Sequence, residues 1–367
     1  MINITFISTY AYNYFFPGKI KHAGGNVRPF NLAKEFAKLS DYRVSCIVGD
    51  FGQPAVLEVE NVRLIKVPIN RPAATINVFR KLKSIHADIF LDFCASPRLL
   101  IFYLLKKMTG CRYIFLTGHD NDVTGNYREV ENRLYDWAYT YGLKHADSII
   151  GQVEEHVELL KKNYDLSSNY VLSPYFNIVP QQEKQEKQFT LWVGRAASYK
   201  NPEAFLSLVK KFPNEKFIMI CNESPYDNGF MTSIREELPF LKNLKFYDYI
   251  AYPDIQKYFK TAKLLVNTSE SEGFPNTFIE AAMNYTPILS LSVDPNGMLS
   301  NFKGGVCCGG DQTQFIKEFK ELVRNDRKLE EYGENAYRYA EKNHQLSMAV
   351  EKIDKIIRGV LNPTDYR

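Results

Sequence analysis

Two glutamates in the segment SESEGFPNTFIEAAM (269–283) have the spacing and setting of a hydroxyl-binding pair. Glu272 stands in a Gly-Phe-Pro turn after a strand-like run, KLLVNTS (263–269), and Glu280 stands eight positions later in a helix-like run. A carboxylate accepts hydrogen bonds from neighbouring hydroxyls, so it is well suited to hold a sugar or a ribose. An acid that merely favours the positive end of a helix would explain Glu272 but leaves Glu280 unexplained.

A cationic pair follows the strand-like run FTLWVG (189–194). Gly194 ends this run, Arg195 and Lys200 lie on the next loop, and Pro202 suits the first turn of a helix. Two cations beside a helix N-terminus are suited to binding a diphosphate. The alternative interpretation is a solvated Lys/Arg pair on a surface loop.

The first half of the chain offers weaker candidates. Gly24 and Gly25 precede a helix-like run, where a glycine pair lets the backbone approach phosphate or sugar, or simply forms a turn. His119 follows a strand-like run and can donate a hydrogen bond to a polar substrate. Asp120 and Asp122 imitate the DxD spacing of a metal site, but acidic triplets are common in loops, so we predict no metal.

Strand-like and helix-like runs alternate along most of the chain, which predicts an α/β protein with two doubly wound domains. The polar segment QQEKQEKQ (181–188) interrupts the alternation and is expected to link domains 1–180 and 181–345. Strands are expected at 2–8, 43–50, 62–68, 88–95, 112–118, 147–153, 170–176, 189–194, 216–222, 244–250, 263–269 and 286–292, and helices at 27–40, 153–164, 201–212, 254–262 and over most of the tail.

Composition limits the class of protein. The chain has 367 residues, of which 45% are apolar and 24% charged, as in globular proteins of two domains. The net charge of +4 is too small to favour nucleic acid as a partner, and all of the excess lies in the first half. Six cysteines without a CxxC pair, no recognisable signal peptide and no long apolar run lead us to expect a cytoplasmic protein.

The second half resembles the donor-binding half of the large retaining glycosyltransferase family often called family 4, of GT-B fold. The resemblance is carried by GRAASYKNPEAF (194–205) and by the stretch from NLKFYDYI to NYTPIL (243–289), and Glu272 and Glu280 match the family's E-x7-E pair. It is strong over most of 189–345. It is weaker in the first half, where it rests on Gly24-Gly25, His119 and the segment ADSIIGQVEEHVELLKK.

This resemblance implies a role for each candidate residue. Arg195 and Lys200 would neutralise the donor diphosphate, Glu272 would hold hydroxyls of the donor sugar, and His119 would reach the reaction from the N-terminal domain, which gives four catalytic residues. Glu280 would bind the ribose. The implied donor- and nucleotide-binding set is Gly25, Gly194, Tyr249, Ile250, Gly273, Phe274, Asn276, Thr277 and Glu280.

The resemblance also implies two Rossmann-like domains facing across a cleft and transfer of a sugar from UDP or GDP to a saccharide or lipid-linked acceptor, with retention and without metal or other cofactor. Cell-surface polysaccharide, lipopolysaccharide or glycolipid synthesis is the expected setting. The helix at 346–367 would cross back to the first domain or pack on its own. The basic first half would touch an anionic inner membrane surface or remain solvated. The alternatives are a sugar-nucleotide epimerase, a phosphorylase of similar architecture, or a non-catalytic sugar-nucleotide-binding paralogue.

Overall fold

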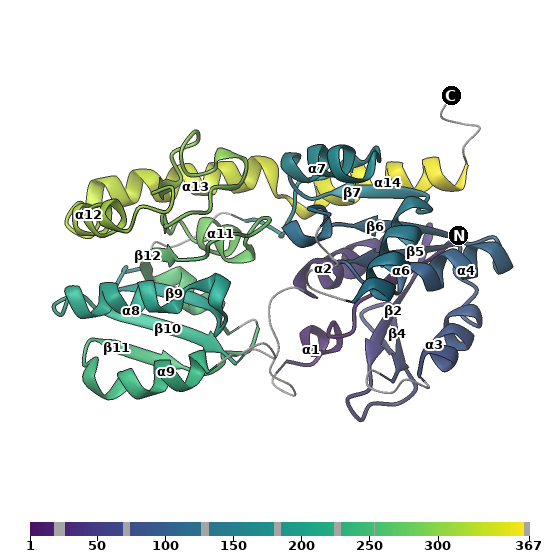
Figure 1. Ribbon diagram of the computed structural model, residues 1–367, viewed down its shortest axis with the longest axis horizontal. Coiled ribbons are helices and arrows are strands. Elements are labelled where there is room, and N and C mark those ends of the chain that lie inside the picture. The colour runs from purple at the N-terminus through teal and green to yellow at the C-terminus, as the bar shows by residue number, and fades with distance from the viewer. Residues whose placement is uncertain are drawn as a thin grey trace. The chain divides into compact units, whose positions relative to one another are not determined.

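The computed structural model describes residues 1–17, 26–68, 74–125, 132–179, 185–223, 229–252 and 254–362. Over these residues the chain divides into two compact units, each built around its own parallel sheet (Figure 1). Unit 1 comprises Met1–Phe16, Gly24–Asn177 and Leu346–Arg367, and unit 2 contains Ile178–Gln345. Part of the expected linker, residues 181–184, and the pair Gly24-Gly25 lie outside the described residues.

The sheet of unit 1 has the strand order β3-β4-β2-β1-β5-β6-β7-β8, and every described pairing is parallel except that of β3 with β4. Successive strands are therefore added on one side of β1 up to β4 and on its other side from β5 onward, so the topological switch point lies between β1 and β5. The strands are β1 (Ile2–Ile7), β2 (Tyr42–Gly49), β3 (Val56–Val59), β4 (Val62–Val67), β5 (Ile89–Phe93), β6 (Arg112–Leu116), β7 (Ser148–Gly151) and β8 (Asn169–Tyr170).

Both faces of this sheet are buried under helices. Its strands are almost continuously apolar, as expected of a parallel sheet covered on both sides, and an apolar layer lies on each face. One layer joins alternate strand residues to α2 (Val27–Phe36) and α14 (Leu346–Leu361). The other joins the remaining residues to α3 (Ala74–Lys83), α4 (Leu99–Thr109), α6 (Arg133–Lys144) and α7 (Glu154–Tyr164).

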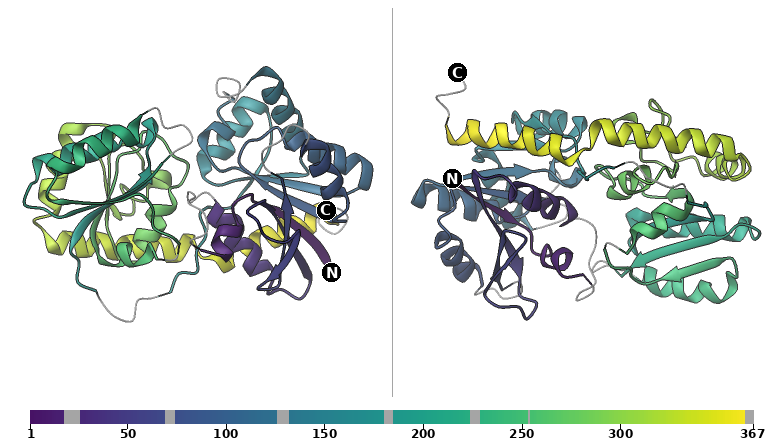
Figure 2. Two further views of the ribbon diagram at one scale, coloured as in Figure 1. Left: turned by 90° about the horizontal axis from the view of Figure 1, so that it is seen from below. Right: turned by 180° about the vertical axis from the view of Figure 1, so that it is seen from behind.

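Helix α14, yellow in Figure 2, lies beside α2 and thus returns the end of the chain to unit 1. Its inward residues recur every three or four positions, as a helix packed on one face requires. Polar contacts at its outer edge add to this packing, since Arg358 bonds Asp41 and Asp354 at 3.0 Å each. The inward residues are Leu346, Ala349, Val350, Ile353 and Ile357.

The sheet of unit 2 is wholly parallel, with the order β11-β10-β9-β12-β13-β14. Here the reversal falls between β9 and β12. The strands are β9 (Phe189–Arg195), β10 (Phe217–Asn222), β11 (Leu244–Tyr247), β12 (Ala262–Asn267), β13 (Ile288–Ser290) and β14 (Gly305–Cys307). The helices are α8 (Pro202–Lys211), α9 (Phe230–Glu237), α10 (Gln256–Thr261), α11 (Asn276–Ala282), α12 (Gln312–Leu322) and α13 (Asp326–Asn343).

The predicted α/β class with two doubly wound, parallel-sheet domains is confirmed, and one predicted strand is largely wrong. Strand β8 ends at Tyr170. The amides of Val171 and Ser173 still donate to the carbonyls of Gly151 and Gln152, but Pro174 has no N–H with which to continue this pairing. Helices α4 and α6 were not anticipated. Within the described part of the chain, no helix has both the length and the apolarity that crossing a membrane would require.

Candidate active site

The carboxyl ends of β9 and β12 bring the main candidate residues together. Strand β9 pairs with β10 on one side and with β12 on the other, so the topological switch point lies between β9 and β12. The loops after these two strands leave the sheet side by side, at the carboxyl ends of the strands. Ligands of open α/β sheets bind at such switch points. The loop after β9 carries Lys200, and the loop after β12 carries Glu272.

Hydrogen bonds fix these two loops to each other. The indole Nε1 of Trp192 donates to Thr268 Oγ1 at 2.9 Å, and Thr268 Oγ1 donates to the carbonyl of Lys200 at 2.7 Å. The amide of Glu270 donates to the carbonyl of Tyr199 at 2.8 Å. The backbone that carries Lys200 is therefore held by the strand and loop that precede Glu272.

Gly194 is required by this packing. A Cβ built on Gly194 would lie 2.6 Å from Cη2 of Trp192, well inside contact distance. Any larger residue would have to displace the ring, and with it the indole bond that joins the two loops. This packing role is separate from the nucleotide-binding role expected for Gly194, which remains a prediction.

Lys200 and Glu272 form an ion pair at the switch point. The distance from Lys200 Nζ to Glu272 Oε1 is 2.6 Å, and the two side chains are only 16% and 14% exposed. The same carboxylate oxygen accepts from Ser269 Oγ at 2.6 Å and from Asn267 Nδ2 at 3.4 Å. Burial alone would raise the pKa of Glu272, but the ammonium of Lys200 and these donors outweigh it and lower the pKa. Glu272 is therefore ionised at neutral pH.

Arg195 adds a second cation at the same edge. It is the last residue of β9 and is half-buried, with Nη2 3.5 Å from the hydroxyl of Tyr199. Helix α8 begins just beyond the loop, where Asn201 caps it by accepting from the amide of Ala204 at 3.2 Å. Arg195 and Lys200 thus flank the start of a helix, as a diphosphate site needs.

Glu280 is a buried carboxylate about one turn inside α11. Its side chain accepts from Gln256 Nε2 at 3.1 Å, and the residue is 8% exposed. Burial raises its pKa to about 7, and the bond from Gln256 opposes the shift only in part. The phenol of Tyr252 also has a raised pKa, through burial and through the charge of Glu280. Glu280 is thus an acceptor held ready for hydroxyl donors.

The other predicted donor-site residues of unit 2 lie on the loops around these acids. Tyr249 and Ile250, both half-buried, follow β11 and lead to Gln256 at the start of α10. Burial raises the pKa of Tyr249. Gly273 and Phe274 are buried in the turn before α11, whose first residues, Asn276 and Thr277, are half-buried.

The ring of Phe274 anchors that turn. Its centroid is 4.5 Å from that of His344 and 6.4 Å from that of Tyr339. Both partners lie at the end of α13, so the turn bearing Glu272 is packed against a long helix.

His119 belongs to unit 1, at the carboxyl end of β6. Its Nδ1 accepts from the amide of Asn121 at 3.2 Å, so Nε2 carries the proton of the neutral ring and can donate. The turn is held by Asp122, whose carboxylate accepts from the amides of Gly118 at 2.5 Å, His119 at 3.0 Å and Ala95 at 2.9 Å. Of the predicted set, Gly25 lies outside the described residues.

Both carboxylates of the DxD-like triplet are bonded to the protein itself. Asp122 holds the turn, and Asp120 Oδ1 lies 3.1 Å from His156 Nε2. Nowhere in the ranges that the structure describes do three or more His, Cys, Asp or Glu side chains gather as a metal ion would need.

Sequence reasoning missed the side chains that support the two acids. Ser269 and Asn267 stand at the carboxyl end of a predicted strand, and that placement was a usable signal. Gln256 lies 24 positions from Glu280, and nothing in the local sequence marks it as a partner. Such a contact follows only from the packing of α10 against α11.

Comparison with known proteins identifies the kind of domain in which these residues lie. Residues 176–339 match the family model described as glycosyl transferases group 1. This part of the chain is a group 1 glycosyltransferase domain. A curated relative described as an uncharacterised glycosyltransferase, from Haemophilus influenzae, is 21% identical over 95% of this chain and 99% of its own length.

Solved structures show that both units of this glycosyltransferase together have the GT-B fold. Sucrose-phosphate synthase from Thermosynechococcus elongatus matches with a TM-score of 0.81 and 14% identity, over 99% of this chain and 100% of its own. TarM of S. aureus, solved with UDP, α-GlcNAc-glycerol and fondaparinux, matches with a TM-score of 0.75 and 12% identity, over 99% and 100%.

Proposed function

We propose that this glycosyltransferase is a retaining, metal-independent enzyme that moves a sugar from UDP or GDP to a saccharide or lipid-linked acceptor in cell-surface glycan or glycolipid synthesis. The observation that carries the proposal is the ion pair of Lys200 with Glu272 at the switch point. One cation and one hydroxyl acceptor thus lie side by side, which suits the adjoining diphosphate and sugar of one donor. The UDP in the TarM structure supports the choice of donor class.

The proposed chemistry depends on charge at the leaving group. As the bond from the anomeric carbon to the β-phosphate oxygen breaks, negative charge grows on the diphosphate, and Arg195 and Lys200 stabilise it. The acceptor hydroxyl forms the new bond on the same face, and its proton passes to the departing β-phosphate oxygen. Glu272 orients the donor sugar and Glu280 the ribose. Two fixed cations supply the stabilising charge that a divalent ion would otherwise provide.

Release of nucleoside diphosphate from sugar donors without acceptor tests this proposal. We expect slow release from at least one UDP- or GDP-sugar in EDTA, and a loss of about 10²-fold or more in Lys200→Met, because the leaving-group charge is then less stabilised. Lys211→Met, which removes an exposed lysine from α8, is the matched control. Absence of both turnover and nucleotide binding would exclude the enzyme and favour a protein of another class.

We also propose peripheral contact with an anionic membrane, and a surface patch on α4 and α6 supports it. Leu104 and Met108 on α4 are 46% and 58% exposed, and Trp137 on α6 is 53% exposed. The ring of Tyr141 joins the two helices, 5.6 Å from Trp137 and 5.1 Å from Tyr103 by ring centroids. Exposed aromatic and aliphatic groups of this kind insert at the headgroup level of a bilayer.

Cations lie on α4 and on the neighbouring helix α3. Lys107 on α4 lies 5.7 Å from the ring of Tyr103, and Arg80 and Lys83 are exposed on α3, which contacts α4. The residue that precedes Lys107, Lys106, is instead bound to Asp147 at 2.8 Å. The remaining cations would attract anionic headgroups, each by about 1 kcal/mol near the surface.

Liposome sedimentation tests the membrane proposal. We expect the protein to sediment with phosphatidylglycerol vesicles at low salt, and less so at high salt or with Trp137→Glu and Met108→Glu combined. Phe240→Glu, at a site that is 83% exposed in unit 2, is the control. Equal sedimentation of the two variants, or no binding at any salt concentration, would contradict this role for the patch.

A further inference from the structure

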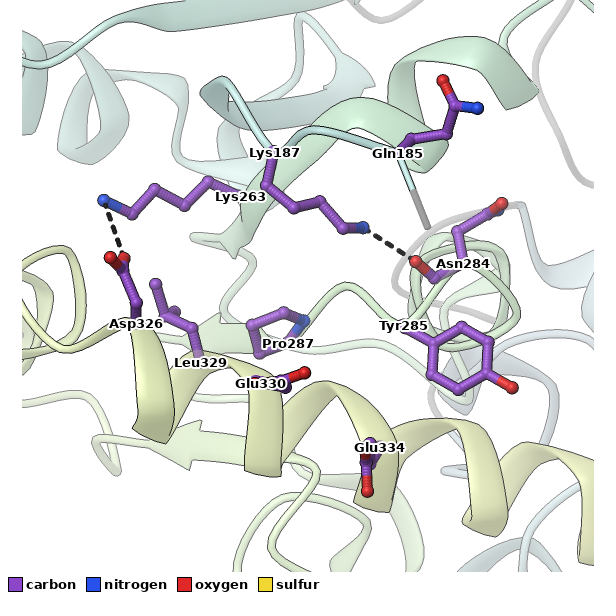
Figure 3. Close-up of a pocket in the computed structure, with 10 residues that line it drawn as sticks. All are labelled: Gln185, Lys187, Lys263, Asn284, Tyr285, Pro287, Asp326, Leu329, Glu330 and Glu334. Carbon is purple, nitrogen blue, oxygen red and sulfur yellow. Dashed lines mark hydrogen bonds and ion pairs between the residues drawn. The ribbon is translucent and has the colours of Figure 1, made fainter. Parts of the chain in front are cut away.

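A cavity in unit 2 lies at the amino ends of the strands, whereas the candidate active site lies at their carboxyl ends. It has a volume of about 540 Å³, within the range of small-molecule sites. It is lined by residues at the amino ends of β9, β12 and β13 and by the first turns of α13 (Figure 3). Helix α11 runs between these two ends, from the turn after β12 to the segment before β13.

Lys187 is the notable group in this cavity. Its ammonium donates to the carbonyl of Asn284 and to Thr286 Oγ1, both at 2.8 Å, and both acceptors are neutral. Among the described residues no carboxylate forms an ion pair with Lys187, and burial lowers its pKa to about 8. Lys187 is half-buried, and a cation that is partly removed from water without a counter-charge is costly. An anion in the cavity would supply that charge.

The bond from Lys187 to Asn284 also has a simpler interpretation, because a lysine at a helix C-terminus satisfies a terminal carbonyl. That interpretation accounts for one of the lysine's bonds but not for the cavity beside it. An ammonium has three donors, and the two bonds from Lys187 leave one of them for a ligand.

The remaining walls suit a hydroxylated molecule. Glu334 on α13 lines the cavity, and its carboxylate accepts from Arg338 at 3.3 Å with capacity for further donors. Pro287 and Leu329 form an apolar surface between the lysine and the helix (Figure 3). Tyr285 stacks on Tyr337 with ring centroids 4.3 Å apart, which fixes one end of the cavity. A small sugar with one anionic group matches a cation, carboxylate acceptors and an apolar surface in this arrangement.

The cavity is connected to Glu280 by hydrogen bonds. Lys187 holds the backbone of Asn284, whose Nδ2 donates to the carbonyl of Glu280 at 2.8 Å and to Gln256 Oε1 at 3.3 Å. Gln256 in turn donates to the Glu280 carboxylate. Asn284 thus orients the amide that supports Glu280, and a ligand that draws Lys187 away from Asn284 would loosen that support.

We propose that this cavity is a regulatory site for a sugar monophosphate, with the phosphate on Lys187 and the hydroxyls on α13, and that its occupation weakens nucleotide binding through Asn284 and Gln256. The coupling to nucleotide binding rests on the proposed role of Glu280, whereas the site itself does not.

Calorimetric titration of glucose 6-phosphate, with glucose and inorganic phosphate as partial ligands, tests the site. We expect glucose 6-phosphate to bind more tightly than either part, both alone and with saturating UDP, which fills the proposed diphosphate site. Lys187→Met should weaken binding at least 10-fold and Glu334→Leu a few-fold, while Lys211→Met has no effect. Glu334 is at the surface, so that variant keeps the test decisive if Lys187→Met does not fold. Unchanged binding in a folded variant at Lys187 or in Glu334→Leu, or no binding to wild type, would overturn the site.

The coupling has a separate readout. Saturating glucose 6-phosphate should raise the Kd for UDP about 3-fold, and Gln256→Leu should abolish that change while still binding the sugar phosphate. An unchanged Kd for UDP in wild type would overturn the coupling alone. If GDP is the nucleotide that binds, the same titration is made with GDP, and failure of both UDP and GDP to bind would instead contradict the proposed donor site.

Discussion

Replacing Glu272 by glutamine is expected to lower turnover on the order of 10²-fold while leaving UDP or GDP bound as tightly as before, or more tightly. The loss follows because the carboxylate is proposed to hold the donor sugar in its reactive orientation. The gain follows from the ion pair, since Lys200 lies 2.6 Å from Glu272 and the amide removes its counter-charge. The freed ammonium is then available to the diphosphate.

Turnover and calorimetric binding on the same preparation measure the two effects separately. Glu270→Gln is a close control, because Glu270 lies on the same loop with an exposed side chain. A similar loss of nucleotide affinity and turnover in Glu272→Gln would mean that Glu272 binds the nucleotide and not the sugar.

Replacing Glu280 by glutamine is expected to weaken nucleotide binding about 10-fold or more while stabilising the unliganded protein at pH 8. The folded-state pKa of Glu280, about 7, exceeds its ordinary value of 4.5, so the folded protein holds this proton more tightly than the unfolded chain. The free energy of unfolding of the wild type therefore falls as pH rises through that interval, by about 3 kcal/mol at most. A neutral glutamine avoids this cost but accepts ribose hydroxyls less strongly.

Denaturant unfolding at pH 5 and pH 8 tests the stability effect. The free energy of unfolding of the variant should exceed that of the wild type at pH 8, and most of this difference should vanish at pH 5, near the lower end of the interval from 4.5 to about 7. Nucleotide affinity should rise more between pH 6 and 8 in the wild type than in the variant. The carboxylate forms only in the wild type, whereas ionisation of the terminal phosphate of the nucleotide, with a pKa of about 6, is common to both. Glu321→Gln on the exposed face of α12 is the control. A stability difference that does not change with pH would contradict burial as the cause.

The sequence predicted the elements whose pattern is local. Buried parallel strands are nearly continuous apolar runs, so β9, β10 and β12 were found close to their observed bounds. The helix-like run that contains Glu280 is also a helix in the structure, α11, which begins at Asn276. Residues 170–176 also form an apolar run, but most of them lie beyond the end of β8. Apolar character alone does not reveal where the pairing of a strand stops.

The support of the candidate site was less accessible. Lys200 lies beside Glu272 because β9 and β12 are neighbours in the sheet. The order of strands in a doubly wound sheet cannot be predicted from the sequence of any single strand. The contact of Gln256 with Glu280 depends on how α10 meets α11, and the raised pKa of Glu280 follows from that burial. The E-x7-E spacing located the acids. Only the fold showed that Glu272 is ion-paired and that Glu280 has no ion-pair partner among the residues that the structure describes.

Calorimetric titration of UDP and GDP, in EDTA, into wild type and Lys200→Met tests the central claim most directly, namely that the carboxyl edge of the unit 2 sheet holds a nucleoside diphosphate. We predict that one of the two nucleotides binds the wild type and that the variant binds it about 10-fold more weakly or worse, because a charged contact to phosphate is lost. Equal affinity for both proteins, or no binding of either nucleotide to the wild type, would contradict the account.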